Sequence, residues 1–275
     1  MSGYDKNIRF VSLSSGSSGN CFLISYNETN ILIDVGIPYK KIEECLRNFG
    51  LRFDDINAIF LTHSHIDHIR AIKQCAKINK IDIYGLKDTL QYIINTYDIT
   101  EDYEDLFHII YGSEVITLDN GFDVEPISSY HDVPSVCYQI TVGDINLAIV
   151  TDLGCFTKKM LSRFNKLDIL VIEANYNDDM LDESTKYPEM LKRRIRGGDG
   201  HLSNKECAEF IKEVYSDRLK KVFLAHLSIE TNTPSLAQTE VLDNLNLLLD
   251  NHNDKMPDVN VLDRFEITEI YKGEY

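Results

Sequence analysis

The sequence predicts an α/β fold in a single domain that spans residues 1–275. Short apolar runs with the character of strands alternate with segments whose apolar residues recur every three or four positions, the spacing of one helix face. The chain is 43% hydrophobic, which is enough for one sizeable core, and no proline- or serine-rich linker divides it. No apolar stretch approaches the roughly 20 residues that cross a bilayer, so no membrane span is predicted.

The predicted strands occur in both halves of the chain. They are residues 8–13, 21–26, 30–34, 57–62, 122–129, 136–142, 145–151, 168–173 and 221–226. A first helix is predicted after Pro38, because Ile42 and Cys45 share one helical face. Gly50 fits the left-handed position that ends such a helix.

Two later helices are predicted. Ser203 and Glu206 have the spacing of a capping box, in which a serine and a glutamate satisfy each other's backbone groups at a helix start. The buried face of that helix begins at Cys207. A similar apolar stripe from Ala237 to Leu249 predicts the last helix.

One cluster of potential metal ligands follows the fourth predicted strand. It comprises His63, His65, Asp67 and His68. Neutral imidazole and carboxylate groups are ligands that zinc, manganese and iron take from proteins. An isolated histidine such as His108 or His252 is more simply an ordinary polar group, whereas adjacent imidazoles repel one another when protonated and need a cation to organise them. The cluster therefore predicts a metal site.

The spacing within this cluster indicates two ions. His63 and His65 fall on the same side of an extended chain and can chelate one ion. Asp67 and His68 open a predicted helix, face a second ion, and place a carboxylate at the positive end of the helix dipole. Four residues cannot close two coordination spheres, so distant strand ends must contribute. The candidates are His131, Asp132, Asp152 and His226. Each of them alone is equally well explained as a polar group that caps a turn.

The formal net charge of −16 argues against binding of nucleic acid, because phosphate neutralisation dominates that affinity. Two divalent cations would place positive charge within the site. A basic run also precedes His201, and it consists of Lys192, Arg193, Arg194 and Arg196. Arginine's planar fork suits phosphate, so the run is predicted to guide a nucleic acid strand, with a solvated surface stretch as the alternative.

Asn20 in the Gly/Ser loop at residues 14–20 is expected to hydrogen-bond substrate, although a flexible turn explains the loop about as well. The six cysteines stand singly among apolar residues without a Cys-x-x-Cys motif, which is typical of buried free thiols in a reducing compartment. Residues 1–7 lack a basic-then-apolar signal segment. We therefore expect a cytoplasmic protein without a cysteine-ligated metal.

The string Thr62-His63-x-His65-x-Asp67-His68, followed in order by His131, Asp152 and His226, resembles the metallo-β-lactamase superfamily. That resemblance implies a four-layer αββα sandwich with two metal ions. It assigns one ion to His63, His65 and His131. It assigns the other to Asp67, His68 and His226, with Asp152 bridging the two. Asp34 matches an early aspartate that orients the metal loops, although a plain turn carboxylate before Gly36 is the alternative.

Further segments resemble the YycJ/WalJ subfamily of bacterial nucleases. They are residues 14–21, 170–175, 192–194, 200–204 and 224–228. This resemblance implies a nuclease for DNA, with exonuclease action linked to repair, that uses a hydroxide bridging two Zn²⁺ or Mn²⁺ ions. In the related tRNA 3′-processing enzymes the equivalents of Glu173 and His201 pair, which implies a dyad that holds His201 protonated toward the leaving group. The catalytic residues expected are thus Asp67, Glu173 and His201.

Other functions remain open from the sequence alone. An RNA-processing nuclease would share the whole pattern. A thioester or lactone hydrolase of glyoxalase II type would share the metal ligands but would not require the basic run or the Glu173–His201 pair. A metal-binding module without catalysis is the third alternative.

Overall fold

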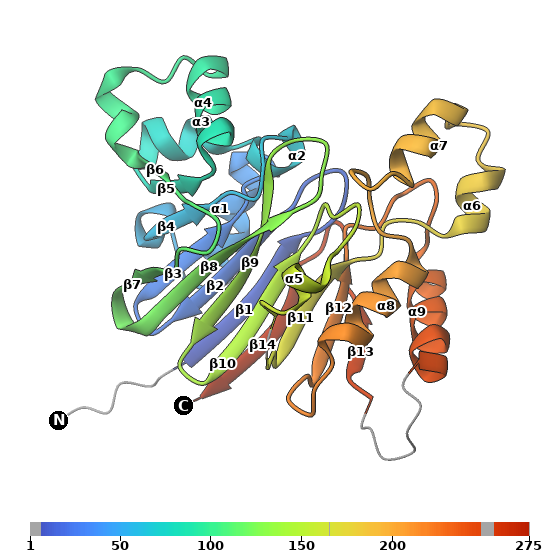
Figure 1. Cartoon of the computed structure of the whole chain (residues 1–275). Coiled ribbons are helices and arrows are strands. Elements are labelled where there is room, and N and C mark those ends of the chain that lie inside the picture. Colours follow the sequence, from blue (N-terminus) through green and yellow to red (C-terminus); the bar gives the residue numbers. More distant parts are fainter. Residues whose placement is uncertain (1–6, 165, 249–255, 275) are drawn as a thin grey trace. The chain divides into compact units, whose positions relative to one another are not determined.

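The computed structural model describes residues 7–164, 166–248 and 256–274. The chain forms two compact units (Figure 1). The first unit comprises Met1–Pro126 and Asp263–Tyr275, and the second comprises Ile127–Leu262. The chain therefore passes from the first unit into the second and back again.

The first unit is built on a mixed sheet of strand order β14-β1-β2-β3-β4-β5-β6. Its strands are β1 (Asn7–Ser14), β2 (Cys21–Tyr26), β3 (Thr29–Ile33), β4 (Ala58–Phe60), β5 (Asp82–Gly85), β6 (Phe107–Ile109) and β14 (Thr268–Glu274). Its α-helices are α1 (Tyr39–Arg47), α2 (Ile66–Ile69), α3 (Ile72–Gln74) and α4 (Lys87–Thr96). It also has the 3₁₀ helices η1 (Phe53–Asp55), η3 (Glu101–Leu106) and η4 (Asp119–Gly121) and the π-helix η2 (Cys75–Asn79).

Successive side chains of a strand point to opposite faces of the sheet, and the apolar ones give this sheet a face against which its helices pack. Val11, Leu23 and Leu32 are fully buried and belong to one core cluster. Ile42 and Leu46 of α1 belong to the same cluster. Because β3 and β4 are parallel, the loops that follow them emerge at the same edge of the sheet. Asp34 and the histidine cluster lie in those two loops.

The second sheet has the strand order β13-β12-β11-β10-β9-β8-β7. Its strands are β7 (Ile116–Leu118), β8 (Phe122–Ser129), β9 (Ser135–Val142), β10 (Ile145–Val150), β11 (Ile169–Glu173), β12 (Lys221–Ala225) and β13 (Asp258–Val261). The strand β7 and the start of β8 fall in the first unit. The second unit's helices are α5 (Lys158–Leu161), α6 (Asp178–Glu183), α7 (Glu189–Ile195), α8 (Asn204–Val214) and α9 (Pro234–Leu248).

Helix α8 packs against α9 in the second unit (Figure 1). Phe210 of α8 and Leu245 of α9 are fully buried in one core cluster with strand residues such as Leu170 and Val222. The strands β10, β11 and β12 are parallel to one another, so the residues that end them meet at one edge. Asp152, Glu173 and His226 lie there.

All nine predicted strands are present within one or two residues of their expected bounds. The helix after Pro38 is confirmed, and Gly50 adopts the left-handed conformation with φ of 74°. The capping box of α8 is also confirmed. The short strands β5 to β7 and the strands of the C-terminal segment, β13 and β14, were not predicted. His252 and Leu249 lie outside the described residues.

The cysteines are free thiols, as predicted, and only Cys155 among them is partly exposed. His108 pairs with Asp82, with 2.9 Å between the imidazole Nε2 and the carboxylate Oδ1. Among the helices of the described segments, none has the length and apolar character that a bilayer crossing requires.

Candidate functional site

The first unit holds a buried network around Asp34, which directly follows β3. The Asp34 carboxylate accepts hydrogen bonds of 2.8 Å from both the backbone N–H and the hydroxyl of Thr62. It also lies 2.7 Å from Nδ1 of His68. Burial raises the pKa of Asp34 above its ordinary value, although His68 and Thr62 act in the opposite direction. The network fixes the ring orientation of His68, which leaves its Nε2 for other contacts.

The histidine cluster lies beside this network. His63 is fully buried, and its Nε2 lies 3.0 Å from Nδ1 of His65. The ring centroids of His63 and His68 are 4.1 Å apart. His65 is the N-cap of α2, and Asp67 stands in the first turn of that helix, as the sequence predicts. The Asp67 carboxylate is 3.7 Å from Nε2 of His68.

Backbone contacts hold α2 in this position. Asn20 N–H donates to the Asp67 carbonyl, and Val35 N–H donates to the His68 carbonyl, both at 2.8 Å. Gly36 packs directly on the same turn, because a Cβ atom there would lie 1.6 Å from the Asp67 carbonyl oxygen. Only glycine permits this approach of two backbone segments.

The Asn20 side chain is engaged within the protein. It is fully buried, its Oδ1 accepts from Gly16 N–H at 2.9 Å, and its Nδ2 lies 3.1 Å from Nε2 of His68. These contacts hold the Gly/Ser loop against the histidine cluster. The expected substrate contact of Asn20 stays a prediction.

The second unit brings together residues that end parallel strands. Asp152 and His226 are left-handed, with φ of 56° and 53°, and Asp34 in the first unit shares this feature with φ of 58°. Left-handed backbone is unfavourable for residues with a Cβ, by about 1 kcal/mol or more, so the surrounding structure enforces these turns. As a result, His226 Nε2 lies 3.6 Å from Asp152 Oδ1.

Glu173 and His201 form the pair that the sequence predicts. Glu173 is fully buried at the end of β11, and its Oε1 lies 2.8 Å from Nδ1 of His201. Burial raises the pKa of Glu173, but the charge and hydrogen bond of His201 outweigh it, so the net pKa is lowered. Burial lowers the pKa of His201, and Glu173 reverses this and raises it above the ordinary value. The pair therefore favours a carboxylate facing an imidazolium.

The capping box explains how His201 is held. Ser203 accepts from Glu206 N–H at 3.2 Å, and Glu206 accepts from Ser203 N–H at 2.8 Å. His201 lies two residues before this rigid start of α8, and its own N–H donates to the Ile195 carbonyl at 2.9 Å. The loop is thus fixed at both sides of the histidine.

His131 follows β8 and is buried beside the same cluster. Its Nδ1 lies 3.1 Å from the Gly200 carbonyl, and its Nε2 lies 3.8 Å from Asp152 Oδ1. Nε2 is also 3.3 Å from Asp132 Oδ1. A carbonyl oxygen can only accept a hydrogen bond, so Nδ1 of His131 carries the proton. Nε2 then keeps a lone pair that can bind a metal ion.

The basic run lies on and after α7, and its members differ in their surroundings. Lys192 is buried, and its Nζ donates to the Asp182 carbonyl at 2.7 Å. Arg196 pairs with the Asp182 carboxylate at 2.7 Å. Arg193 and Arg194 are exposed, and Arg194 donates to the Asp132 carboxylate. The three arginines of the run are thus exposed, whereas Lys192 is buried.

The donor atoms of both clusters fit divalent metal ions. In the second unit, Asp152, Glu173, His201 and His226 each offer a ligand atom, and these atoms lie within 4.8 Å of one another. In the first unit, the candidate ligand atoms are imidazole nitrogens of His63, His65 and His68, and the Asp67 carboxylate lies near His68. Imidazole and carboxylate sets without a thiolate suit zinc or manganese.

Sequence reasoning missed how Thr62 and Gly36 act. Thr62 carries the hydrogen bonds from Asp34 to the cluster, and its hydroxyl lies 3.0 Å from His63 Nδ1. The position of Thr62 directly before His63 was the available signal. Gly36 stands two residues after Asp34, but nothing local in the sequence shows that it meets α2.

Comparison with known proteins agrees with these features. The family described as the beta-lactamase superfamily domain matches residues 29–226. Exodeoxyribonuclease WalJ of Streptococcus pneumoniae serotype 2 is 32% identical over 86% of this chain and 88% of its own. Exodeoxyribonuclease YycJ of Bacillus anthracis is 29% identical over 85% of this chain and 88% of its own.

The fold is shared with a solved structure. The metallo-beta-lactamase fold protein YhfI of Bacillus subtilis aligns with a TM-score of 0.70 at 15% identity, over 96% of this chain and 99% of that one. The α/β fold class predicted from the sequence is thereby confirmed, with two mixed sheets and accompanying helices. The chain belongs to the beta-lactamase superfamily, and within it to the family of WalJ.

Proposed function

We propose that this protein is a metal-dependent nuclease that hydrolyses phosphodiester bonds of DNA from a strand end. The observation that carries the proposal is membership in the family of an exodeoxyribonuclease by a chain that has histidine and aspartate at every metal-ligand position of the motif. An acyl hydrolase would not need the buried Glu173–His201 pair, which suits protonation of a departing oxygen.

We propose that seven residues of the motif hold two ions, Zn²⁺ or Mn²⁺. One ion is assigned to His63, His65 and His131. The other is assigned to Asp67, His68 and His226, and Asp152 is shared. The superfamily motif supports this assignment, and so does the donor chemistry of each cluster.

Bound divalent ions supply a water of lowered pKa and neutralise charge on the transferring phosphate oxygens. The residues of the chain orient the ligands and donate the proton. Asp34 and Thr62 fix the rings of the first cluster. Glu173 holds the proton on His201, whose Nε2 is then the group that donates a proton to the leaving oxygen of the phosphodiester.

Arg193 and Arg194 are the proposed contacts to the DNA backbone, because their guanidinium groups are exposed beside the loop that carries His201. Lys192 is the weaker candidate, since its ammonium group is already bound within the unit. We place the protein in the cytoplasm on the basis of its free thiols and assign it to DNA repair by its family.

Digestion of end-labelled DNA, a matched RNA and a glutathione thioester, each with added Mn²⁺ or Zn²⁺, tests the proposal. We expect metal-dependent release of nucleotides from DNA. His63→Ala should abolish the activity, and His201→Ala should lower it by roughly 10²–10⁴-fold. His108→Ala, a histidine outside both clusters, serves as the matched control and should retain full activity. Cleavage of the RNA or the thioester alone would contradict the proposal.

A further inference from the structure

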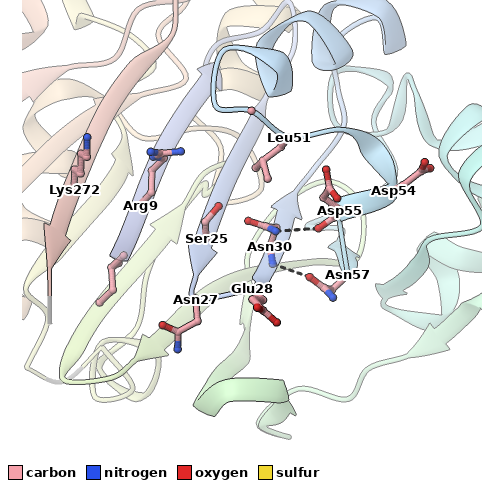
Figure 2. Close-up of a pocket in the computed structure, with 12 residues that line it drawn as sticks. Arg9, Ser25, Asn27, Glu28, Asn30, Leu51, Asp54, Asp55, Asn57 and Lys272 are labelled. Atoms are coloured by element: carbon pink, nitrogen blue, oxygen red, sulfur yellow. Dashed lines mark hydrogen bonds between the residues drawn. The ribbon is translucent and has the colours of Figure 1, made fainter. Parts of the chain in front are cut away.

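The first unit contains a pocket at the sheet edge opposite the metal-ligand loops. Its volume is about 710 Å³, and Figure 2 shows the residues that line it. Asn30 and Asn57 lie at the N-terminal ends of β3 and β4, whereas Asp34 and His63 follow the C-terminal ends of the same strands. At about 3.3 Å per residue, the pocket is separated from Asp34 by more than 10 Å along β3.

Four polar side chains form a row on the sheet beneath this pocket. Lys272, Arg9, Ser25 and Asn30 are direct cross-strand partners on β14, β1, β2 and β3 (Figure 2). Directly opposed residues share one face of a sheet, so the row presents adjacent donors to the pocket. The next row along the strands, which contains Val11 and Leu23, is apolar core.

Neither cation of this row has a close ion-pair partner among the described side chains. Arg9 and Lys272 stand directly opposite each other, an arrangement of like charges that destabilises a sheet. The Glu269 carboxylate lies 4.0 Å from Nε of Arg9, and the guanidinium lies 5.0 Å from the ring centroid of Phe49. Lys272 has no ion pair with any side chain that the structure describes. An anion between the two would relieve the repulsion.

Ser25 adds a buried donor without a partner. It is 9% exposed, and its Oγ makes no hydrogen bond to any residue that the structure describes. Nε of Arg9 and Oδ1 of Asn27 are also unsatisfied within that part of the chain. Buried polar atoms without partners are costly, so such a group facing a pocket marks a place where a ligand completes the bonding.

Hydrogen bonds from Asn30 connect this row to the loop that precedes β4. Asn30 N–H donates to Asn57 Oδ1 at 2.7 Å, and Asn30 Nδ2 donates to the Asp55 carbonyl at 3.0 Å. The carboxylates of Glu28 and Asp54 line the same space. These acceptors suit hydroxyl and N–H groups of a ligand, and their negative charge disfavours a second phosphate.

We propose that this pocket binds a nucleoside monophosphate, with its phosphate at Lys272, Arg9 and Ser25 and its sugar and base toward Glu28 and Asp54. The volume is far larger than a lone anion needs and lies within the usual range for ligands of this size. The inference concerns a second site and does not depend on the proposed nuclease activity.

Calorimetric titration of the whole protein with deoxyadenosine monophosphate tests this site. Lys272→Ala should weaken binding about tenfold or more, since it removes a charged donor, and Ser25→Ala should weaken it about threefold or more. Lys40→Ala, an exposed lysine outside the pocket, is the matched control and should bind like the wild type. Nucleotide held by the metal ligands contributes equally in all four proteins, because none of these changes touches a proposed ligand.

Two further comparisons complete the test. Deoxyadenosine and ribose 5-phosphate should each bind at least tenfold more weakly than the nucleotide, and equal binding of either would overturn the proposal. Without ligand, Lys272→Ala should melt no lower than Lys40→Ala, because it removes a repulsion. A clear fall in its melting temperature, or unchanged nucleotide binding, would also overturn it.

Discussion

Asp34, Asp152 and His226 share one backbone feature that local sequence rules disfavour. Each follows a buried strand and adopts a left-handed conformation, although none is glycine. Strain of this kind persists where a function requires the geometry, which agrees with the proposed roles of these residues.

The Glu173–His201 pair should make the stability of the metal-free protein depend on pH. The lowered pKa of Glu173 gives stability that is present above its ordinary value of 4.5 and is lost as the pH falls through the folded value. The raised pKa of His201 gives stability that is present below its ordinary value of 6.5 and is lost as the pH rises through the folded value.

Melting temperatures of wild type and Glu173→Gln, measured in chelator from pH 3 to 9, check this expectation. The difference between the two proteins should be largest between about pH 4.5 and 6.5 and should shrink on both sides. A difference that stays constant over the whole range would mean that the pair contributes no ionic interaction.

At the scale of residues, the grouping of candidate metal ligands after β4 could be predicted, because the motif itself brings these histidines together in the chain. His63, His65 and His68 stand together in the chain, and the pairing of Glu173 with His201 followed from the family pattern. The surroundings of Asn20 and Lys192 could not be predicted, because their partners Gly16 and Asp182 are chosen by loop geometry.

At the scale of elements, the short helix α2 is held by its neighbours. It has only four residues, too few to be stable alone, and its position depends on backbone contacts with Asn20, Val35 and Gly36. The positions of Asp67 and His68 therefore depend on two earlier loops, one at Val35 and Gly36 about 30 residues before them and one at Asn20 about 47 residues before them.

Gly36→Ala should displace α2 and weaken metal binding. The added methyl group would overlap the Asp67 carbonyl, and overpacking of this kind costs about 1–3 kcal/mol of stability. Gly198→Ala is the matched control, because the nearest atom to its new Cβ is Cys155 Sγ at 3.7 Å. Denaturant unfolding and a metal-binding titration of both variants check the prediction, and equal behaviour of the two would contradict it.

The elements that could be predicted from the sequence were those with a clear local pattern of hydrophobic residues or a capping motif. The buried strands β10, β11 and β12 and the capped helix α8 are examples, since hydrophobic runs and a capping box define them locally. The strand β14 was missed because its place is set by pairing with β1, which lies more than 250 residues earlier. Such pairing leaves no local signal.

At the scale of the whole molecule, the prediction of one domain is still open, and the course of the chain favours it. Residues 263–275 return to the first unit after the second is complete, and β8 crosses the boundary between Pro126 and Ile127. The first unit is made of two separate pieces of the chain, and β8 begins in the first unit and ends in the second. We therefore expect the two to fold together.

Differential scanning calorimetry checks this expectation. The protein should unfold in one transition whose calorimetric and van't Hoff enthalpies agree. Two separate transitions, one of which is shifted by a substitution in the core of the second unit such as Leu245→Ala, would show that the units fold independently.

The central proposal is that seven histidine and aspartate residues of the motif hold two ions. Metal analysis by mass spectrometry after equilibration with Mn²⁺ or Zn²⁺ tests it most directly. We predict two ions per chain in the wild type, in His201→Ala and in the His108→Ala control, and a loss of metal both in His63→Ala of the first unit and in Asp152→Ala of the second. Two ions retained in either of these last variants would contradict the account.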